Sequence, residues 1–257
     1  MPSSSGPSLR VLVTGASRGI GAAIVAELGA QGHRIALTAR TEADLVAVAA
    51  AVDGPTLVLP ADAIDPAAPQ RLIDAVVAEW GGIDVLVLNA GEAVSAPIER
   101  TDEELWNSLL EINLTSPFRF VRAATPVMKA QGFGRMIVVA SVASKIGAPY
   151  ISAYVSAKHG VLGMVRAAAA ELATTGITVN AVCPGYVDTP MTQRSVDAIV
   201  AKTGRSRELV LGNLESAQPI GRLITAAEVA TAVSFLANDS GGINGQSIVI
   251  DGGAVQS

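Results

Sequence analysis

A glycine-rich segment between a predicted strand and a predicted helix constrains the fold of this chain more than any other feature. The segment TGASRGIG, residues 14–21, follows the apolar run Leu9–Thr14 and opens a helical pattern that continues to Gln31. Its three glycines permit a tight turn and let a phosphate group approach the backbone, while the helix N-terminus supplies N–H donors and a positive dipole end. A loop of this kind at a strand–helix junction predicts a βα unit that binds a dinucleotide.

Short apolar runs alternate with helical patterns along the rest of the chain. The expected strands are Leu9–Thr14, Arg34–Ala39, Thr56–Pro60, Val85–Leu88, Arg135–Ala140, Ile177–Val182 and Ser247–Ile250. The expected helices are Ile20–Gln31, Glu42–Val52, Pro66–Trp80, a long one over Glu103–Ala130, and one that carries Tyr154 and ends near Thr174. Strands that are apolar on both faces and separated by helices indicate a covered parallel sheet. We predict an α/β fold: one doubly wound Rossmann domain with a seven-stranded parallel sheet flanked by helices on both faces.

Two segments depart from this alternation. Residues 1–8 are rich in Ser, Pro and Gly, and we expect them to form a disordered leader before a single dinucleotide-binding and catalytic domain over residues 9–257. Residues 187–221 are polar, contain glycine and show only a weak helical pattern. A segment of this character late in an α/β chain often covers a site, so we expect it to cover the substrate.

Composition excludes several classes of function. The net charge is -5 and no Lys/Arg cluster is present, which argues against nucleic-acid binding. Apolar runs stay shorter than the ~20 residues that a membrane span needs, and no secretory signal is visible. Cys183 is the single cysteine, and no His or acidic pair has metal-ligand spacing, so we expect neither disulfides nor a metal site. We expect a cytoplasmic protein with no nucleic-acid or membrane partner.

Ser141, Tyr154 and Lys158 form a candidate proton-transfer site. Tyr154 and Lys158 are four positions apart, so on a helix they share one face. An ammonium beside a phenol is expected to lower its pKa toward the range that a general acid or base needs. The Ser141 hydroxyl would hold a substrate oxygen against the phenol.

The residues after the second expected strand bear on the choice of dinucleotide. NAD-binding proteins place an acidic residue there for the ribose 2′-hydroxyl, whereas NADP-binding proteins place a cation. This chain has Arg40 there and no acid before Glu42, and Arg18 in the glycine loop adds a second charge. The two arginines favour NADP(H) over NAD(H), although either is also an ordinary surface residue in many proteins.

With these motifs in place, the chain resembles the short-chain dehydrogenase/reductase family over residues 9–253. The similarity rests on the glycine loop and on Asp62, Asn89-Ala90-Gly91, Asn113, Ser141, the YVSAK segment from Tyr154 to Lys158, Pro184-Gly185, Thr189 and the final Asp251-Gly252-Gly253. The family commonly has N-N-A-G where this chain has Leu88 before Asn89. Because that position lies on a strand, we expect altered packing there and retained activity.

The resemblance implies a role for each matched residue. Ser141 would orient a carbonyl, Tyr154 would protonate it, and Lys158 would bind the nicotinamide ribose. Asn113 would hold a helix kink and a water of the proton relay. Asp62 and Ala63 would contact the adenine, Asn89 the adenine ribose region, and Val187 and Thr189 the carboxamide. The full expected cofactor site is Gly15, Ser17, Arg18, Gly19, Ile20, Gly21, Arg40, Asp62, Ala63, Asn89, Ala90, Gly91, Tyr154, Lys158, Pro184, Gly185, Val187 and Thr189.

Within the family, the stretch Thr174–Gly185 resembles 3-oxoacyl-thioester reductases of the acyl-carrier-protein type and aromatic-polyketide ketoreductases. The resemblance implies a small-molecule or thioester substrate and a homotetramer. Lys202, Arg205 and Arg207 would meet phosphates of a carrier arm, or are solvated helix residues. An apolar pocket is expected from Val142, Ile146, Tyr150, Tyr186 and Met191, beside Ser141 and Tyr154.

Three functions remain open at this point. The first is NADPH-dependent reduction of a 3-oxoacyl thioester or similar ketone. The second is NAD-dependent oxidation of a secondary alcohol, 3-hydroxyacid or 3-hydroxyacyl-CoA. The third is a cofactor sensor without activity, which the complete set of Asn113, Ser141, Tyr154 and Lys158 disfavours.

Overall fold

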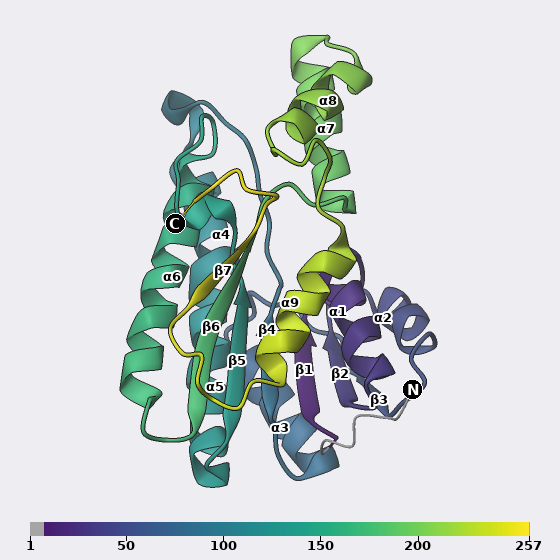
Figure 1. Cartoon of the computed structure of the whole chain (residues 1–257), viewed down its shortest axis with the longest axis vertical. Coiled ribbons are helices and arrows are strands. Elements are labelled where there is room, and N and C mark those ends of the chain that lie inside the picture. The colour runs from purple at the N-terminus through teal and green to yellow at the C-terminus, as the bar shows by residue number, and fades with distance from the viewer. Residues whose placement is uncertain (1–7, 257) are drawn as a thin grey trace.

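A computed structural model describes residues 8–256, and within them seven parallel strands form one sheet. The strands lie in the order β3-β2-β1-β4-β5-β6-β7 (Figure 1). Their bounds are Arg10–Thr14 (β1), Arg34–Thr38 (β2), Thr56–Val58 (β3), Val85–Leu88 (β4), Gly134–Val139 (β5), Ile177–Pro184 (β6) and Ser247–Ile250 (β7). The chain changes direction across the sheet between β3 and β4, so β1 and β4 are neighbours at a topological switch point, where open α/β sheets bind ligands. The predicted fold is confirmed.

Helices cover both faces of the sheet (Figure 1). One face carries α1 (Gly19–Ala30), α2 (Glu42–Ala49) and α9 (Ala226–Ala237), and the other carries α3 (Ala68–Trp80), α4 (Glu103–Leu110), α5 (Ser116–Gln131) and α6 (Ser152–Leu172). Successive residues of a strand point to opposite faces. In β4, accordingly, Val85 and Val87 pack beneath α1 and α9, while Leu86 and Leu88 pack toward α3, α5 and α6.

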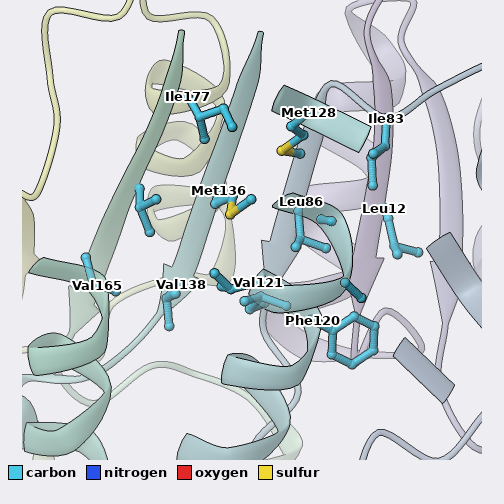
Figure 2. Packing of buried hydrophobic residues seen from close by; sticks show 14 of the residues in the cluster. Leu12, Ile83, Leu86, Phe120, Val121, Met128, Met136, Val138, Val165 and Ile177 are labelled. Atoms are coloured by element: carbon cyan, nitrogen blue, oxygen red, sulfur yellow. The ribbon is translucent and has the colours of Figure 1, made fainter. Parts of the chain in front are cut away.

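Figure 2 shows the core between the sheet and the helices α3, α5 and α6. Phe120 and Met128 of α5 and Val165 of α6 belong to one buried cluster with Leu86 of β4 and Met136 of β5. Leu88, which replaces the first Asn of the family pattern, ends β4 and is 3% exposed in this core. The expected placement of Leu88 on the strand is confirmed, and its side chain contributes apolar burial at the edge where the site lies.

Several expected elements end one to three residues away from their observed bounds, for example β3 at Val58 rather than Pro60 and α2 at Ala49 rather than Val52. Other differences bear on the site or on the sheet. The predicted helix Glu103–Ala130 contains a π-helical turn, Glu111–Thr115, between α4 and α5. Strand β6 runs to Pro184 rather than Val182 because it pairs with β7 as far as the Pro184–Ile250 register. Helix α9 was not predicted, although Thr225 and Glu228 form a capping box at its start. The predicted leader falls, except for Ser8, outside the described residues.

Residues 187–221 fold into α7 (Pro190–Thr203) and α8 (Arg207–Ser216), which stand beyond the carboxyl ends of the strands at the top of Figure 1. The two ends of the segment meet in a short stem. The Asp188 N–H donates to the Ile224 carbonyl (2.8 Å), and the Ile224 N–H donates to the Tyr186 carbonyl (2.9 Å). This stem joins the helical pair to the end of β6.

Candidate active site

The four candidate catalytic residues reach one cavity at the carboxyl edge of the sheet. Ser141 follows β5, Tyr154 and Lys158 share a face of α6, and Asn113 lies in the π-helical turn. All four line a cavity of about 110 Å³. The Ser141 hydroxyl accepts a hydrogen bond from the Ala143 N–H (3.1 Å). Tyr154 and Lys158, which are four positions apart on α6, reach the same cavity, as their spacing predicts.

Lys158 is buried and directed at the backbone. Its ammonium donates to the Val139 carbonyl (3.0 Å), and the Nζ atom lies 5.6 Å from the centroid of the Tyr154 ring. Burial lowers the pKa of Lys158 to about 8. The group is thus held near the neutral range by desolvation.

The pKa of Tyr154 differs from the sequence-based expectation. Burial raises the pKa of this phenol, and a hydrogen bond with Ser141 lowers it by less. The Lys158 ammonium was expected to lower this pKa, but it is not among the groups that do so here. In this structure Tyr154 is held as a protonated phenol, which is the form that donates a proton.

Asn113 connects the π-helical turn to the loop after β4. It is 1% exposed, and its amide donates to the carbonyls of Glu92 (2.8 Å) and Leu109 (3.0 Å). Its Oδ1 atom accepts from the Glu92 N–H at 3.3 Å. Both backbone groups of Glu92 are therefore bonded to one buried side chain, which fixes the loop at the cavity.

The glycine loop packs tightly against the loop after β4. The Asn89 amide donates to the carbonyls of Thr14 (3.1 Å) and Gly15 (3.0 Å), and Gly15 has φ = 64°. A Cβ added at Gly21 would lie 2.2 Å from the Gly15 oxygen, so only glycine fits there. No side chain caps the N-terminus of α1, and its first turn has no acidic residue. The N–H groups of this turn are therefore open to an anion, as a dinucleotide pyrophosphate requires.

The remaining expected cofactor residues surround this loop. Arg18 precedes α1, Arg40 follows β2, and both side chains are exposed without an ion-pair partner among residues 8–256. Asp62 and Ala63 follow β3, where the Ala63 carbonyl accepts from the Ser116 hydroxyl at 2.7 Å. These positions extend from the glycine loop across β2 and β3, where a Rossmann fold binds the adenosine half of a dinucleotide.

The segment after β6 closes the other side of the cavity. Pro184, Gly185, Val187 and Thr189 line it, together with Ile20, Asn89 and Gly91. A Cβ added at Gly19 would lie 3.3 Å from the Thr189 side chain, so the glycine loop and the start of α7 are in close contact. Expected cofactor residues from both halves of the chain thus line the same cavity, whereas Arg40, Asp62 and Ala63 lie outside its lining.

The expected substrate residues divide into two groups. Met191 of α7 lines the cavity, whereas Val142, Ile146, Tyr150 and Tyr186 do not. Ile146, Tyr150 and Tyr186 are 46%, 66% and 44% exposed and lie outside the lining. Glu92 and Thr192 line the cavity without having been predicted. Glu92 directly follows the matched Asn89-Ala90-Gly91, and that adjacency is the signal that was available for it.

Two further features bear on the class of site. Residues 8–256 contain no group of three or more His, Cys, Asp or Glu side chains placed to hold a metal ion. In the same range, no helix has the length and apolar character needed to cross a membrane.

The doubly wound sheet, the glycine loop and the Ser–Tyr–Lys cavity together define a nicotinamide-dinucleotide oxidoreductase. A family model described as "Enoyl-(Acyl carrier protein) reductase" matches residues 15–255. The chain belongs to the short-chain dehydrogenase/reductase family, as its motifs predicted.

Similar proteins cover nearly the whole chain. A Streptomyces virginiae protein named as the ketoacyl reductase of the monensin polyketide synthase is 42% identical over 252 residues, which are 94% of this chain and 95% of that protein. A D-beta-hydroxybutyrate dehydrogenase of Rhizobium meliloti is 36% identical over 249 residues (94% and 96%). A crystal structure of an actinorhodin polyketide ketoreductase variant with NADPH has a TM-score of 0.90 and 35% identity, covering 96% of this chain and 97% of that one.

Proposed function

We propose that the chain catalyses NADPH-dependent reduction of a ketone to a secondary alcohol, with a 3-oxoacyl thioester or similar ketone as the substrate. The observation that carries this proposal is the convergence of Ser141, Tyr154, Lys158 and Asn113 on one cavity, beside residues of the glycine loop and of the segment after β6. The similarity to ketoacyl and polyketide ketoreductases supports the same reaction.

The proton chemistry belongs to the chain's own side chains. NADPH supplies the hydride when bound, and the overall reaction consumes one proton. Tyr154 donates that proton to the carbonyl oxygen, and Ser141 donates a hydrogen bond to the same oxygen as negative charge develops. Burial raises the pKa of Tyr154, so the phenol stays protonated at neutral pH. Lys158 binds the nicotinamide ribose, and Asn113 holds a water that returns a proton toward Tyr154.

The preference for NADPH rests on Arg18 and Arg40. A guanidinium group can pair with a phosphate through two parallel hydrogen bonds, and both side chains are exposed without another ion-pair partner among the described residues. We propose that they bind the 2′-phosphate. A covering role for residues 187–221, a cytoplasmic location and a homotetramer also stay predictions.

A second candidate is oxidation of a 3-hydroxyacid or another secondary alcohol with NAD. It is favoured by the 36% identity to a D-beta-hydroxybutyrate dehydrogenase. The same proton path then runs in reverse, with Tyr154 as the base. The absence of an acidic residue between Thr38 and Thr41 weighs against NAD.

The test is a steady-state assay with a 3-oxoacyl thioester and each reduced cofactor. We expect kcat/KM to be at least tenfold higher with NADPH than with NADH, and Arg40→Ala to reduce that ratio. Ser141→Ala is expected to lower kcat about 100-fold with either cofactor, as for loss of one donor to a developing oxyanion. Higher activity with NADH, or oxidation of 3-hydroxybutyrate without reduction of any 3-oxoacyl compound, would favour the second candidate.

A further inference from the structure

Glu92 is an acidic residue in the wall of the catalytic cavity that the proposed reaction does not use. It lies in the loop after β4 and lines the cavity with Ser141 and Tyr154. Its backbone is held on both sides by the buried amide of Asn113, through the 2.8 Å and 3.3 Å hydrogen bonds. Although the residue is exposed, its backbone position relative to the catalytic groups is therefore fixed.

The balance of charge in this cavity does not suit an anionic substrate. Among the described residues that line it, Lys158 is the single basic one. The Lys158 ammonium is bonded to the Val139 carbonyl and lies beside Tyr154, where it serves the proposed cofactor and the proton path. A substrate carboxylate near the reacting carbonyl would lie close to the negative charge of Glu92. No further basic side chain among the described lining residues could pair with that carboxylate.

The polar donors of the lining are also already used. The Asn89 amide donates to two backbone carbonyls, and the Asn113 amide does the same. The Thr192 hydroxyl donates to the Val187 carbonyl at 2.6 Å. The hydroxyl protons of Ser141 and Tyr154 are those assigned to the reacting carbonyl. No side-chain donor among these groups is left to bind a substrate carboxylate, and an unpaired carboxylate in a cavity is costly.

We infer that Glu92 determines specificity: it makes the cavity selective for 3-oxo compounds with an uncharged acyl end, namely esters and thioesters, against free 3-oxo acid anions. The inference rests on the proposed function and narrows its substrate class. Glu92 would act by repelling the free 3-oxo acid anion rather than by attracting the ester or thioester. It also separates the two candidate functions, because a 3-hydroxyacid is an anion at neutral pH and a thioester is not.

The test compares methyl acetoacetate with acetoacetate in the NADPH-dependent reaction of the whole enzyme at neutral pH. In the wild type, kcat/KM is expected to be higher for the ester. Glu92→Gln keeps the size of the side chain and removes its charge, so the ester/acid ratio of kcat/KM should fall about tenfold, a size typical of a like-charge repulsion in a partly solvated site. The matched control is Glu99→Gln, because Glu99 is exposed, lies outside the cavity lining, and changes the net charge by the same amount.

A salt series on the wild type supplies a readout that does not depend on any variant. Raising ionic strength from about 0.01 M to 0.5 M screens the repulsion, so the ester/acid ratio should fall in the wild type and change less in Glu92→Gln. An unchanged ratio in Glu92→Gln, or an equal fall in Glu99→Gln, would overturn the inference while leaving the proposed reductase intact. No turnover of either compound, nor of a 3-oxoacyl thioester, would overturn the proposed function and this inference with it.

Discussion

The carboxyl edge of the sheet and residues 187–221 border the same cavity, but they are held in different ways. At the sheet edge, Asn113 is 1% exposed and Lys158 is 5% exposed, and each donates to backbone carbonyls. In α7 and α8, Val196 and Val210 are the buried residues and most other side chains contact solvent. The difference indicates that proton-transfer groups are positioned by the core, whereas the helical pair depends on its stem.

One buried amide adds to the two backbone hydrogen bonds of the stem. Gln218 is 2% exposed; its Oε1 atom accepts from the Tyr186 N–H (3.0 Å), and its Nε2 atom donates to the carbonyls of Tyr186 (3.1 Å) and Arg222 (2.7 Å). Farther out, Lys202 of α7 donates to the Ser95 carbonyl at 3.1 Å. Because few bonds hold this region, changes there should alter substrate binding more than the chemical step.

The largest expected effect is a difference in how much a substitution in each region lowers the free energy of unfolding. Phe120 is 1% exposed in the core beneath the site, so Phe120→Ala should lower the free energy of unfolding by roughly 3–5 kcal/mol. Leu209 of α8 is 53% exposed, and Leu209→Ala should change it by less than about 0.5 kcal/mol. Urea unfolding of both variants measures the difference, and equal losses would show that α8 is as tightly packed as the core.

A second prediction concerns the buried charge of Lys158 in the cofactor-free enzyme. Its pKa is about 8 in the folded protein and 10.5 for an ordinary exposed lysine. Below pH 8 both states bind the proton and the burial penalty is complete. Between pH 8 and 10.5 the unfolded state binds more protons, so stability rises with pH and the penalty disappears. Relative to Lys158→Met, the wild type should gain roughly 3 kcal/mol over this window.

The measurement for Lys158 is denaturant unfolding at several pH values, with Lys202→Met as the control for loss of an exposed lysine. That control should follow the wild-type pH dependence. If Lys158→Met followed it as well, the Lys158 ammonium would not carry the burial penalty that the structure assigns to it.

The third prediction tests the link between the core and the cavity. Asn113→Ala removes the two hydrogen bonds that fix Glu92 and leaves its backbone groups without those partners. We expect kcat to fall about 100-fold, within the range for loss of a group in a proton path. The Kd for NADPH should stay within about threefold, because the glycine loop is untouched. A fall in NADPH affinity as large as the fall in kcat would indicate general disruption of the site.

The smallest expected effect is in the stem. Gln218→Leu preserves approximate size but removes three hydrogen bonds, and we expect KM for the ketone to rise about fivefold with kcat changed less than twofold. Steady-state kinetics on a 3-oxo ester measure both constants. A change in kcat alone would indicate that the stem affects the chemical step rather than substrate binding. The two regions would then not differ in the way proposed here.

Local patterns predicted much of the fold and part of the site. The spacing of Tyr154 and Lys158 indicates a shared helix face because helical geometry depends only on separation along the chain. The glycine loop was placed correctly at the first strand–helix junction for the same reason. Helix α9 carries an equally local signal, the capping box of Thr225 and Glu228, although no helix was predicted there.

What the sequence did not reveal depends on distant contacts. Glu92 and Thr192 reach the cavity only because the loop after β4 and the start of α7 are brought together by the sheet. The predicted direction of the Tyr154 pKa shift was wrong for a related reason. Spacing places an ammonium near the phenol, but the partial burial of Tyr154, the burial of Lys158 and the bond from Lys158 to Val139 are tertiary properties.

We propose that Tyr154, held protonated at the sheet edge, donates the proton of the reaction. Single-turnover oxidation of bound NADPH by a 3-oxo ester in Tyr154→Phe tests it most directly, with NADPH binding followed by nicotinamide fluorescence. We expect a fall of at least about 1,000-fold in the rate of NADPH oxidation, with the Kd for NADPH within a few-fold of wild type. Oxidation at more than about a tenth of the wild-type rate would contradict it.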